Sequence, residues 1–230
     1  MLPLKVASNR RATPTSRVLR LALGRQPFAY RAGQAAWLRV DTERERTPYS
    51  IASSPEETSR QGWLEFLVKT DQSNRFGAHV DELPRGSTVL VHGPIGSFVF
   101  PDMPAERRFL FIAGGTGIAP LRSMLRHAID ASVPGRKTLL YSARTPDEFA
   151  YLPELRALER EGAIDLTLTL TGIADRWRHS RGRAGTELLA PLVDADTLCF
   201  LCGPPSMIRE VPEILRALGV PQKRIRTEEY

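Results

Sequence analysis

Gly114-Gly115-Thr116-Gly117-Ile118-Ala119-Pro120 is the most informative segment of the sequence. It follows the apolar run Phe109–Ala113 and precedes the amphipathic run Leu121–Ala128, which predicts a strand, a glycine turn and the start of a helix. A helix N-terminus presents unpaired N–H groups and the positive end of the helix dipole, so it suits a phosphate or pyrophosphate. The stretch is therefore a candidate nucleotide-binding loop, although a tight turn that merely joins a strand to a helix would read the same.

The pattern of apolar and polar residues changes near residues 101–106, which predicts two domains, 1–103 and 104–230. The first part has short apolar or alternating runs broken by turn residues, and we expect an antiparallel barrel of six strands. Its predicted strands are Val18–Leu23, Ala36–Val40, Tyr49–Ser53, Trp63–Lys69 and Thr88–His92, with a short helix near Phe76–Leu83.

In the second part, strand-like runs alternate with helical runs, which predicts a doubly wound parallel sheet covered by helices. The predicted strands are Phe109–Ala113, Thr138–Ser142, Ile164–Leu170, Thr197–Leu201 and Arg224–Glu228. The predicted helices are Ala119–Asp130, Pro153–Arg160, Thr186–Leu189 and Ser206–Leu218. Ligands of such sheets bind at the carboxyl ends of the strands, so we expect the glycine turns Gly114–Gly117 and Gly203-Pro204-Pro205 to lie near each other.

Composition narrows the functional classes. The sequence contains no apolar run of about 18 residues and no apolar signal segment at its start, so we expect no membrane span and a cytoplasmic location. The net charge is +6, and the excess is mostly arginine, with a cluster at Arg176, Arg178, Arg181 and Arg183. This cluster fits a small anionic substrate, an acidic protein partner or a solvated loop. Aromatic residues are sparse, at 7%, and are not interleaved with the basic ones, so we expect no nucleic acid partner.

Metal centres are also disfavoured. The two cysteines, Cys199 and Cys202, cannot supply a four-cysteine zinc or iron–sulfur site, and the four histidines are scattered. The C-x-x-C spacing is typical of redox disulfides, but these residues fall in an apolar run that predicts a strand. Side chains three residues apart on a strand point to opposite faces, so we expect neither a disulfide nor a bound metal.

Four segments in order, spread over nearly the whole chain, resemble the ferredoxin–NADP reductase superfamily of flavoproteins. They are Thr47-Pro48-Tyr49-Ser50, Gly93–Phe98, Gly114–Pro120 and Cys202–Met207. The resemblance implies a flavin-binding barrel followed by an NAD(P)-binding domain. It also implies an oxidoreductase that takes hydride from NADPH or NADH onto a flavin and releases the electrons to a separate acceptor.

The resemblance assigns the flavin site. Tyr49 would pack on the flavin ring and Ser50 would hydrogen-bond flavin N5. Thr47 replaces the family's phosphate-binding arginine, and Arg46 lies one residue early. Three explanations stay open: the strand bulges, another arginine serves, or backbone N–H groups bind the phosphate. The second phosphate segment would be residues 74–77, and we choose FAD over FMN as the family's commoner cofactor. The cofactor-binding residues expected here are Arg46, Thr47, Pro48, Tyr49, Ser50, Asn74, Phe76 and Gly77.

The resemblance also assigns the dinucleotide site and the hydride-transfer site. Two loops would hold the nicotinamide dinucleotide, and they contain Gly114, Gly115, Thr116, Gly117, Pro120, Cys202, Gly203, Pro204, Pro205 and Met207. Ser142 and Arg144 would bind the adenosine end, and an arginine there favours the 2′-phosphate of NADPH over NADH. Tyr230 would stack on the flavin where nicotinamide must land. The catalytic group would be Ser50, Cys202, Glu228 and Tyr230.

The acceptor follows from the charge. A basic surface suits an acidic redox protein such as a ferredoxin or flavodoxin, because opposite charges speed encounter. An oxygenase component or a diffusible oxidant are the other acceptors, and we expect a monomer. The alternative function is an electron-transfer subunit of a larger redox complex that is inactive alone.

Overall fold

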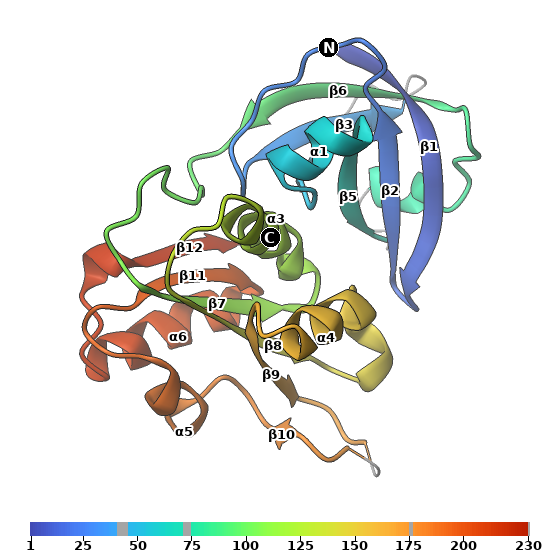
Figure 1. Cartoon of the computed structure of the whole chain (residues 1–230). Helices are drawn as coiled ribbons and strands as arrows, with labels where there is room; N and C mark the ends of the chain where they lie inside the picture. The colour runs from blue at the N-terminus through green and yellow to red at the C-terminus, as the bar shows by residue number, and fades with distance from the viewer. Residues whose placement is uncertain (41–45, 71–74, 175–176, 230) are drawn as a thin grey trace. The chain divides into compact units, whose positions relative to one another are not determined.

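The computed structural model describes residues 1–40, 46–70, 75–174 and 177–229 (Figure 1). They form two units. The first unit comprises Met1–Phe100 and Arg122–Ala131, and the second comprises Pro101–Leu121 and the residues from Ser132 onward. The division after Phe100 falls close to the predicted domain boundary. Residues Arg122–Ala131, predicted as part of the second domain, group instead with the first unit.

The first unit is built on an antiparallel sheet. Its six strands, among the residues described, are β1 (Leu2–Thr13), β2 (Ser16–Ala22), β3 (Ala35–Val40), β4 (Thr47–Ser50), β5 (Trp63–Lys69) and β6 (Thr88–Ile95). Their order across the sheet is β4-β3-β6-β1-β2-β5. The two outer strands meet where Ile51, just after β4, bridges to Phe66 on β5, so the sheet closes on itself. The predicted six-stranded antiparallel barrel is confirmed.

Two strand boundaries differ from the prediction. The sequence does not predict β1, because its hydrophobic alternation stops after Val6 and polar residues follow. The strand predicted as Thr88–His92 is longer, because β6 continues to Ile95, which pairs with Ala35 on β3. A Cβ atom on Gly93 would lie 3.1 Å from the Cβ of Ala36, so glycine lets the two strands approach closely here.

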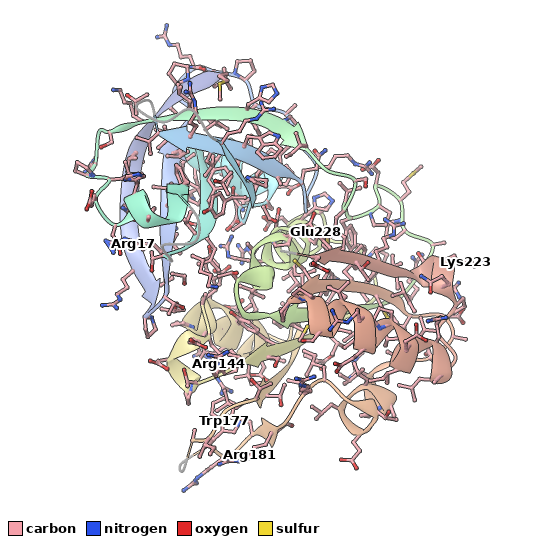
Figure 2. The ribbon with its side chains drawn as sticks, turned by 180° about the vertical axis from the view of Figure 1, so that it is seen from behind. Arg17, Arg144, Trp177, Arg181, Lys223 and Glu228 are labelled. Carbon is pink, nitrogen blue, oxygen red and sulfur yellow. The ribbon has the colours of Figure 1, made fainter. Side chains whose placement is uncertain are left out.

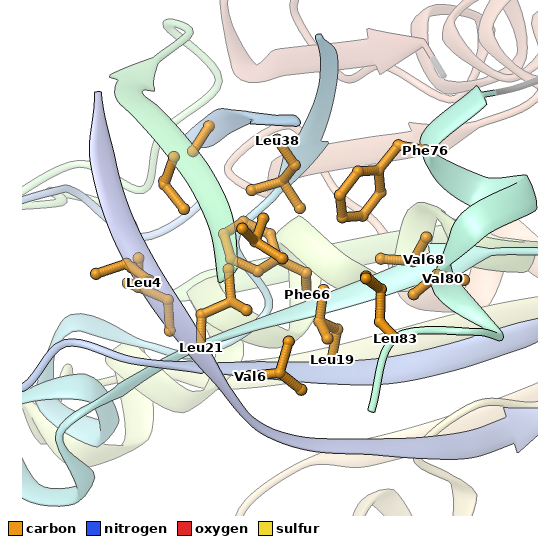
Figure 3. Close-up of a cluster of buried hydrophobic side chains, with 14 of the residues drawn as sticks. Leu4, Val6, Leu19, Leu21, Leu38, Phe66, Val68, Phe76, Val80 and Leu83 are labelled. Atoms are coloured by element: carbon orange, nitrogen blue, oxygen red, sulfur yellow. The ribbon is translucent and has the colours of Figure 1, made fainter. Parts of the chain in front are cut away.

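The barrel core collects the inward-facing side chains of these strands (Figure 3). Leu19 and Leu21 on β2 alternate with outward residues, as the period of a strand requires. Each large side chain that is fully buried contributes about 1.5–3 kcal/mol to folding. The labelled core residues are Leu4, Val6, Leu19, Leu21, Leu38, Phe66, Val68, Phe76, Val80 and Leu83.

Two short helices complete the first unit. The helix α1 (Pro55–Gln61) is absent from the predicted elements. It begins with a capping box: the Glu57 N–H donates to Ser54 Oγ at 3.1 Å and the Ser54 N–H donates to Glu57 Oε2 at 3.0 Å. The second helix, α2 (Arg75–Val80), ends earlier than predicted, and the Asn9 side chain donates to the Val80 carbonyl at 2.6 Å.

The second unit contains a parallel sheet. Its strands, within the described part of the chain, are β7 (Arg108–Gly114), β8 (Arg136–Ala143), β9 (Asp165–Leu170), β10 (Ser180–Arg181), β11 (Leu198–Gly203) and β12 (Ile225–Glu229). The order β10-β9-β8-β7-β11-β12 runs outward from β7 in one direction and then from β11 in the other. This is the predicted doubly wound sheet, with its switch point between β7 and β11. Only the two-residue edge strand β10 is missing from the prediction.

Three helices among the described residues lie wholly in this unit: α4 (Leu152–Arg160), α5 (Thr186–Leu189) and α6 (Pro205–Ala217). A further helix, α3 (Ile118–Asp130), begins in this unit, and its residues from Arg122 group with the first unit. Figure 1 shows α5 and α6 on one side of the sheet, where Leu189 and Val211 pack against Leu110 and Leu201. The opposite face of the sheet carries aromatic rings, and Phe111 on β7 stacks on Phe200 on β11 at 5.4 Å. In the described part of the chain, no helix combines the length and the apolar character needed to cross a membrane.

Candidate functional site

The two predicted glycine turns of the second unit pack directly against each other. A Cβ atom on Gly114 would lie 2.8 Å from Pro204 Cδ, and one on Gly117 would lie 2.3 Å from the Cys202 carbonyl oxygen. A Cβ atom on Gly203 would meet Met207 Sδ at 2.7 Å. At these positions the missing side chains make room for the neighbouring loop. The expectation that the two turns lie together is met at the carboxyl ends of β7 and β11.

The first turn leads into α3. Gly115–Gly117 form a short 3-10 turn, and Gly115 has φ +53°, in the left-handed region that favours glycine. Thr116 is half-buried, and Pro120 lies in the first turn of the helix, as predicted. The Ile118 N–H donates to the carbonyls of Gly115 and Thr116, and Pro120 has no N–H, so the candidate donors next to the carboxyl end of β7 are the N–H groups of the glycine turn itself. This donor set suits a pyrophosphate.

Cys202 and Glu228 belong to one line of residues across the sheet. Cys202 on β11 pairs with Ala113 on β7 and with Glu228 on β12, and partners in a parallel register share a face. The Cys202 thiol is 1% exposed, and burial raises its pKa well above the usual range, with a further rise from the charge of Glu228. The thiol is therefore protonated at neutral pH, which makes Cys202 a compact neutral group.

Cys199 lies on the opposite face of β11, as predicted. It packs in the cluster of side chains beneath α6, and both cysteines are free thiols. Among the described residues, no group of three or more His, Cys, Asp or Glu side chains could hold a metal ion.

The residues expected near the adenosine end lie at the carboxyl end of β8: Ser142 within the strand and Arg144 directly after it. Ser142 is buried, whereas the Arg144 side chain is exposed. The Gly172 N–H donates to the Arg144 carbonyl at 3.0 Å, which ties the end of β8 to the end of β9. Figure 2 labels Arg144, Trp177 and Arg181 at the same end of this unit. Arg181 lies on β10, two strands from β8, so the structure brings these basic groups to one edge of the sheet.

The expected flavin segment is β4 in the first unit. Its pairing with β3 is regular from Thr47 to Ser50, so the strand does not bulge there. Thr47 and Tyr49 pair with Leu38 and Ala36, which face the barrel core. The Arg46 guanidinium instead lies 4.8 Å from the Trp37 ring, on the other face of the sheet, beside Pro48. Arg46 therefore does not replace the family arginine on the Thr47 face.

Tyr49 lies beside the second expected phosphate segment. Its half-buried ring is 5.5 Å from the ring of Phe76 on α2, at an interplanar angle of 54°. Gly77 follows Phe76 on the same helix, and Ser50 at the end of β4 is half-buried. Asn74 and Tyr230, also expected here, lie outside the described residues.

Comparison with known proteins assigns an FAD-binding domain to the first part of the chain and an NAD-binding domain to the second. Residues 3–100 match the family model of the oxidoreductase FAD-binding domain, and residues 111–213 match that of the oxidoreductase NAD-binding domain. Ferredoxin–NADP reductase B of Sorangium cellulosum is 33% identical over 192 residues, which cover 79% of this chain and 77% of that protein. The chain belongs to the ferredoxin–NADP reductase-like flavoprotein oxidoreductases.

Two further comparisons show how much of this chain and of its relatives correspond to each other. The fold matches a crystal structure of a ferredoxin NADP+ reductase from Neisseria gonorrhoeae with bound FAD and NADP, with a TM-score of 0.86, 20% identity, and coverage of 99% of this chain and 98% of that one. The reductase component of propane 2-monooxygenase from Rhodococcus jostii is 28% identical over 86% of this chain, but the chain spans only 55% of that relative.

The family membership makes FAD and NAD(P)H the cofactors of this flavoprotein oxidoreductase. The residues present fit both. The paired glycine turns offer backbone donors for a pyrophosphate, and the half-buried Tyr49 ring offers an aromatic surface for a flavin.

One set of residues near the flavin segment was missed by the sequence analysis. Arg122 on α3 donates to the Ala52 carbonyl at 2.7 Å and to both carboxylate oxygens of Glu57 at 3.0 Å. The neighbouring Ser123 hydroxyl donates to the Ser53 carbonyl at 2.7 Å. These contacts hold the residues that directly follow Tyr49 and Ser50. The Ser54-x-x-Glu57 pattern with Pro55 predicts the capped helix, but no sequence pattern predicts the partner of Arg122.

Proposed function

We propose that this flavoprotein oxidoreductase oxidises NADPH in preference to NADH and passes the electrons through FAD to a separate protein acceptor. Residues 1–103 would bind the flavin and residues 104–230 the dinucleotide. The observation that carries the proposal is the packing of the Gly114–Gly117 turn against the Cys202–Met207 loop at the switch point of the sheet. Bound FAD accepts a hydride from the dinucleotide and can release the electrons one at a time.

The proposed roles on the dinucleotide side follow from chemistry. The turn at Gly115 and Thr116 binds the pyrophosphate through N–H groups. The protonated Cys202 thiol leaves space for the nicotinamide ring and adds no charge beside it, since burial keeps it neutral. Glu228, in register with Cys202, supplies the acidic group of this site.

The proposed roles on the flavin side belong to Tyr49 and Ser50. The Tyr49 ring packs against the flavin, and the Ser50 hydroxyl donates to N5. Because Thr47 cannot pair with a phosphate as arginine does, we infer that backbone N–H groups near Gly77 or another basic side chain hold the flavin phosphates. Tyr230 stays a prediction as the ring that covers the flavin.

The preference for NADPH rests on Arg144. Its exposed guanidinium at the carboxyl end of β8 can pair with a 2′-phosphate, and arginine binds phosphate in a fixed fork geometry. Arg181 on the neighbouring edge of the sheet adds positive charge.

The acceptor is proposed from charge and from relatives. The net charge of +6 favours an acidic partner. Related proteins include a ferredoxin–NADP reductase and the reductase component of a propane monooxygenase, so a ferredoxin, a flavodoxin or an oxygenase component are the candidates. A monomeric state and a cytoplasmic location stay predictions that gel filtration and cell fractionation test.

Anaerobic titration of the purified protein tests the proposal. We expect the absorption bands of oxidised flavin to bleach at a lower concentration of NADPH than of NADH. The flavin released by denaturation should be FAD. A protein that takes up neither FAD nor FMN would overturn the proposed flavin site, and bleaching by NADH alone would overturn the role of Arg144. Turnover of a dye acceptor by the isolated protein would distinguish an active enzyme from a subunit that is inactive alone.

A further inference from the structure

Tyr141 connects the glycine turn after β7 with the segment that follows β8, both in the second unit. It lies on β8, is fully buried, and pairs in register with Ala113, the residue before the Gly114 turn. Its hydroxyl donates to the Gly115 carbonyl at 3.1 Å and accepts from the Ala150 N–H at 3.2 Å. One side chain therefore contacts both the end of β7 and the segment that follows β8.

The hydrogen bond from the Tyr141 hydroxyl orients the peptide group between Gly115 and Thr116. Gly115 has the backbone freedom of glycine and sits between Gly114 and Gly117, so the turn has little stiffness of its own. In a trans peptide, the carbonyl and the following N–H point in opposite directions. Because the Gly115 carbonyl is held toward the buried Tyr141, the Thr116 N–H is directed away from the core, where an anion can reach it.

The Tyr141 ring begins a column of aromatic side chains. Phe149 meets it edge-on, with centroids 4.9 Å apart, and Trp177 stacks on Phe149 at 5.6 Å and 15°. The Trp177 indole N–H donates to the Ser180 carbonyl at 2.8 Å, and Ser180 begins the short strand that carries Arg181. The column thus reaches from the glycine turn to the basic edge of the sheet.

We propose that Tyr141, Phe149 and Trp177 act together as positioning residues for the dinucleotide. Tyr141 orients the N–H groups of the Gly115 turn, and Trp177 fixes the segment that carries Arg181. The column fixes the distance between the Gly115 turn and the segment that carries Arg181. The protein can therefore bind the dinucleotide without first ordering these two segments. This inference rests on the proposed NAD(P)H oxidation.

Tyr141→Phe in the FAD-loaded protein tests the hydroxyl. The change keeps the ring and its packing but removes one of the two donors to the Gly115 carbonyl and leaves it with the Ile118 N–H alone. We expect KM for NADPH and for NADH to rise about threefold to tenfold, as for the loss of one hydrogen bond, while kcat and the flavin spectrum stay unchanged. An unchanged KM, or a fall in kcat alone, would overturn the proposal.

Tyr30→Phe is the matched control. Tyr30 is also a largely buried tyrosine whose hydroxyl is hydrogen-bonded, to Ser53 and Thr58, but it lies in the first unit. We expect it to leave KM for both dinucleotides unchanged. An equal rise in KM in this variant would show that general destabilisation, rather than positioning, causes the effect.

A double-variant cycle tests whether the column acts as one support. Trp177→Leu alone should raise KM, and adding it to Tyr141→Phe should raise KM by less than the product of the two single changes, because the two residues share one role. Fold-changes that simply multiply would contradict a common support. A wild-type protein that binds FAD but does not oxidise NAD(P)H would instead refute the proposed function itself.

Discussion

Arg122 and Glu57 form a doubly hydrogen-bonded ion pair within the first unit. Each terminal nitrogen of Arg122 donates to a different carboxylate oxygen of Glu57 at 3.0 Å, and both residues are buried. Glu57 also closes the capping box of α1, so a single carboxylate fixes the start of that helix and neutralises a buried cation. The Ala52 carbonyl is held by the same guanidinium at 2.7 Å.

Removing one member of this pair should destabilise the protein strongly. For Arg122→Met we expect the free energy of unfolding to fall by about 3–5 kcal/mol, because the buried Glu57 would lose its doubly hydrogen-bonded partner and keep only Arg126, 3.5 Å away. Urea unfolding of the FAD-loaded protein measures this. Arg60→Met is the matched control: Arg60 pairs with Asp130 at 2.8 Å but its side chain is 52% exposed, so its loss should destabilise the protein much less than the loss of Arg122. Equal losses in the two variants would contradict the importance of the buried pair.

A methyl group on Gly117 should separate the two loops of the dinucleotide site. In Gly117→Ala the new Cβ would lie 2.3 Å from the Cys202 carbonyl oxygen, so one loop must move. We expect KM for NADPH to rise more than tenfold, roughly the effect of a misplaced binding loop, with FAD still bound. Gly185→Ala is the control, since its Cβ would meet only the Arg183 carbonyl oxygen at 3.8 Å. A Gly117→Ala protein with wild-type KM would contradict the packing described here.

Arg144 should discriminate between the two dinucleotides. We expect Arg144→Gln to raise KM for NADPH about tenfold or more and to leave KM for NADH unchanged, because only NADPH carries the 2′-phosphate. Arg136→Gln is the control. Arg136 begins β8, at the end of the strand far from Arg144, and pairs with Asp165 at 2.6 Å, so we expect this change to leave KM for both dinucleotides unchanged. Parallel changes for both dinucleotides in Arg144→Gln would assign Arg144 to another role.

The buried thiols should make stability depend on alkaline pH. Burial raises the pKa of Cys199 to about 12 and that of Cys202 well above its usual range. In the unfolded chain both thiols ionise near pH 8.5, roughly the ordinary value, so above this pH the unfolded state binds fewer protons than the folded state. Stability is therefore fully present below about pH 8.5 and falls as the pH rises, by up to about 1.4 kcal/mol per pH unit for each thiol.

The measurement is urea unfolding between about pH 7 and pH 10, compared with a Cys199→Ala, Cys202→Ala variant. This variant should be less stable at neutral pH, because it loses buried atoms, but should lose less stability as the pH rises. Identical slopes for the two proteins would show that the thiols ionise equally well in the folded state.

The sequence predicts the second unit more completely than the first. The central strands β7 and β11 are continuous apolar runs because they are buried on both faces, and such runs are visible without knowing their neighbours. β1 is different, because Asn9 and Arg11 use their side chains to satisfy backbone carbonyls, and this polar pattern hides the strand. β10 is too short, at two residues, to produce any pattern.

The candidate site divides in the same way. Motifs identify the glycine turns, because local backbone geometry requires glycine there, and the Tyr49–Ser50 segment is identified through the family resemblance. The sequence could not reveal Arg122 as the partner of Glu57, since 65 residues separate them, nor Tyr141 as the support of Gly115, since a tyrosine in an apolar strand looks like an ordinary core residue. Contacts that depend on tertiary packing leave no periodic signal.

The contact between the Gly114 turn and the Cys202 loop has a consequence for protein engineering. Each loop is shaped by the other: Gly114 leaves room for Pro204 and Met207, and Gly117 leaves room for the backbone at Cys202. If only one loop came from a relative, it would pack against a second loop whose shape fits the original sequence of the first. Grafts intended to change dinucleotide specificity should therefore exchange both segments together, as one interlocking pair.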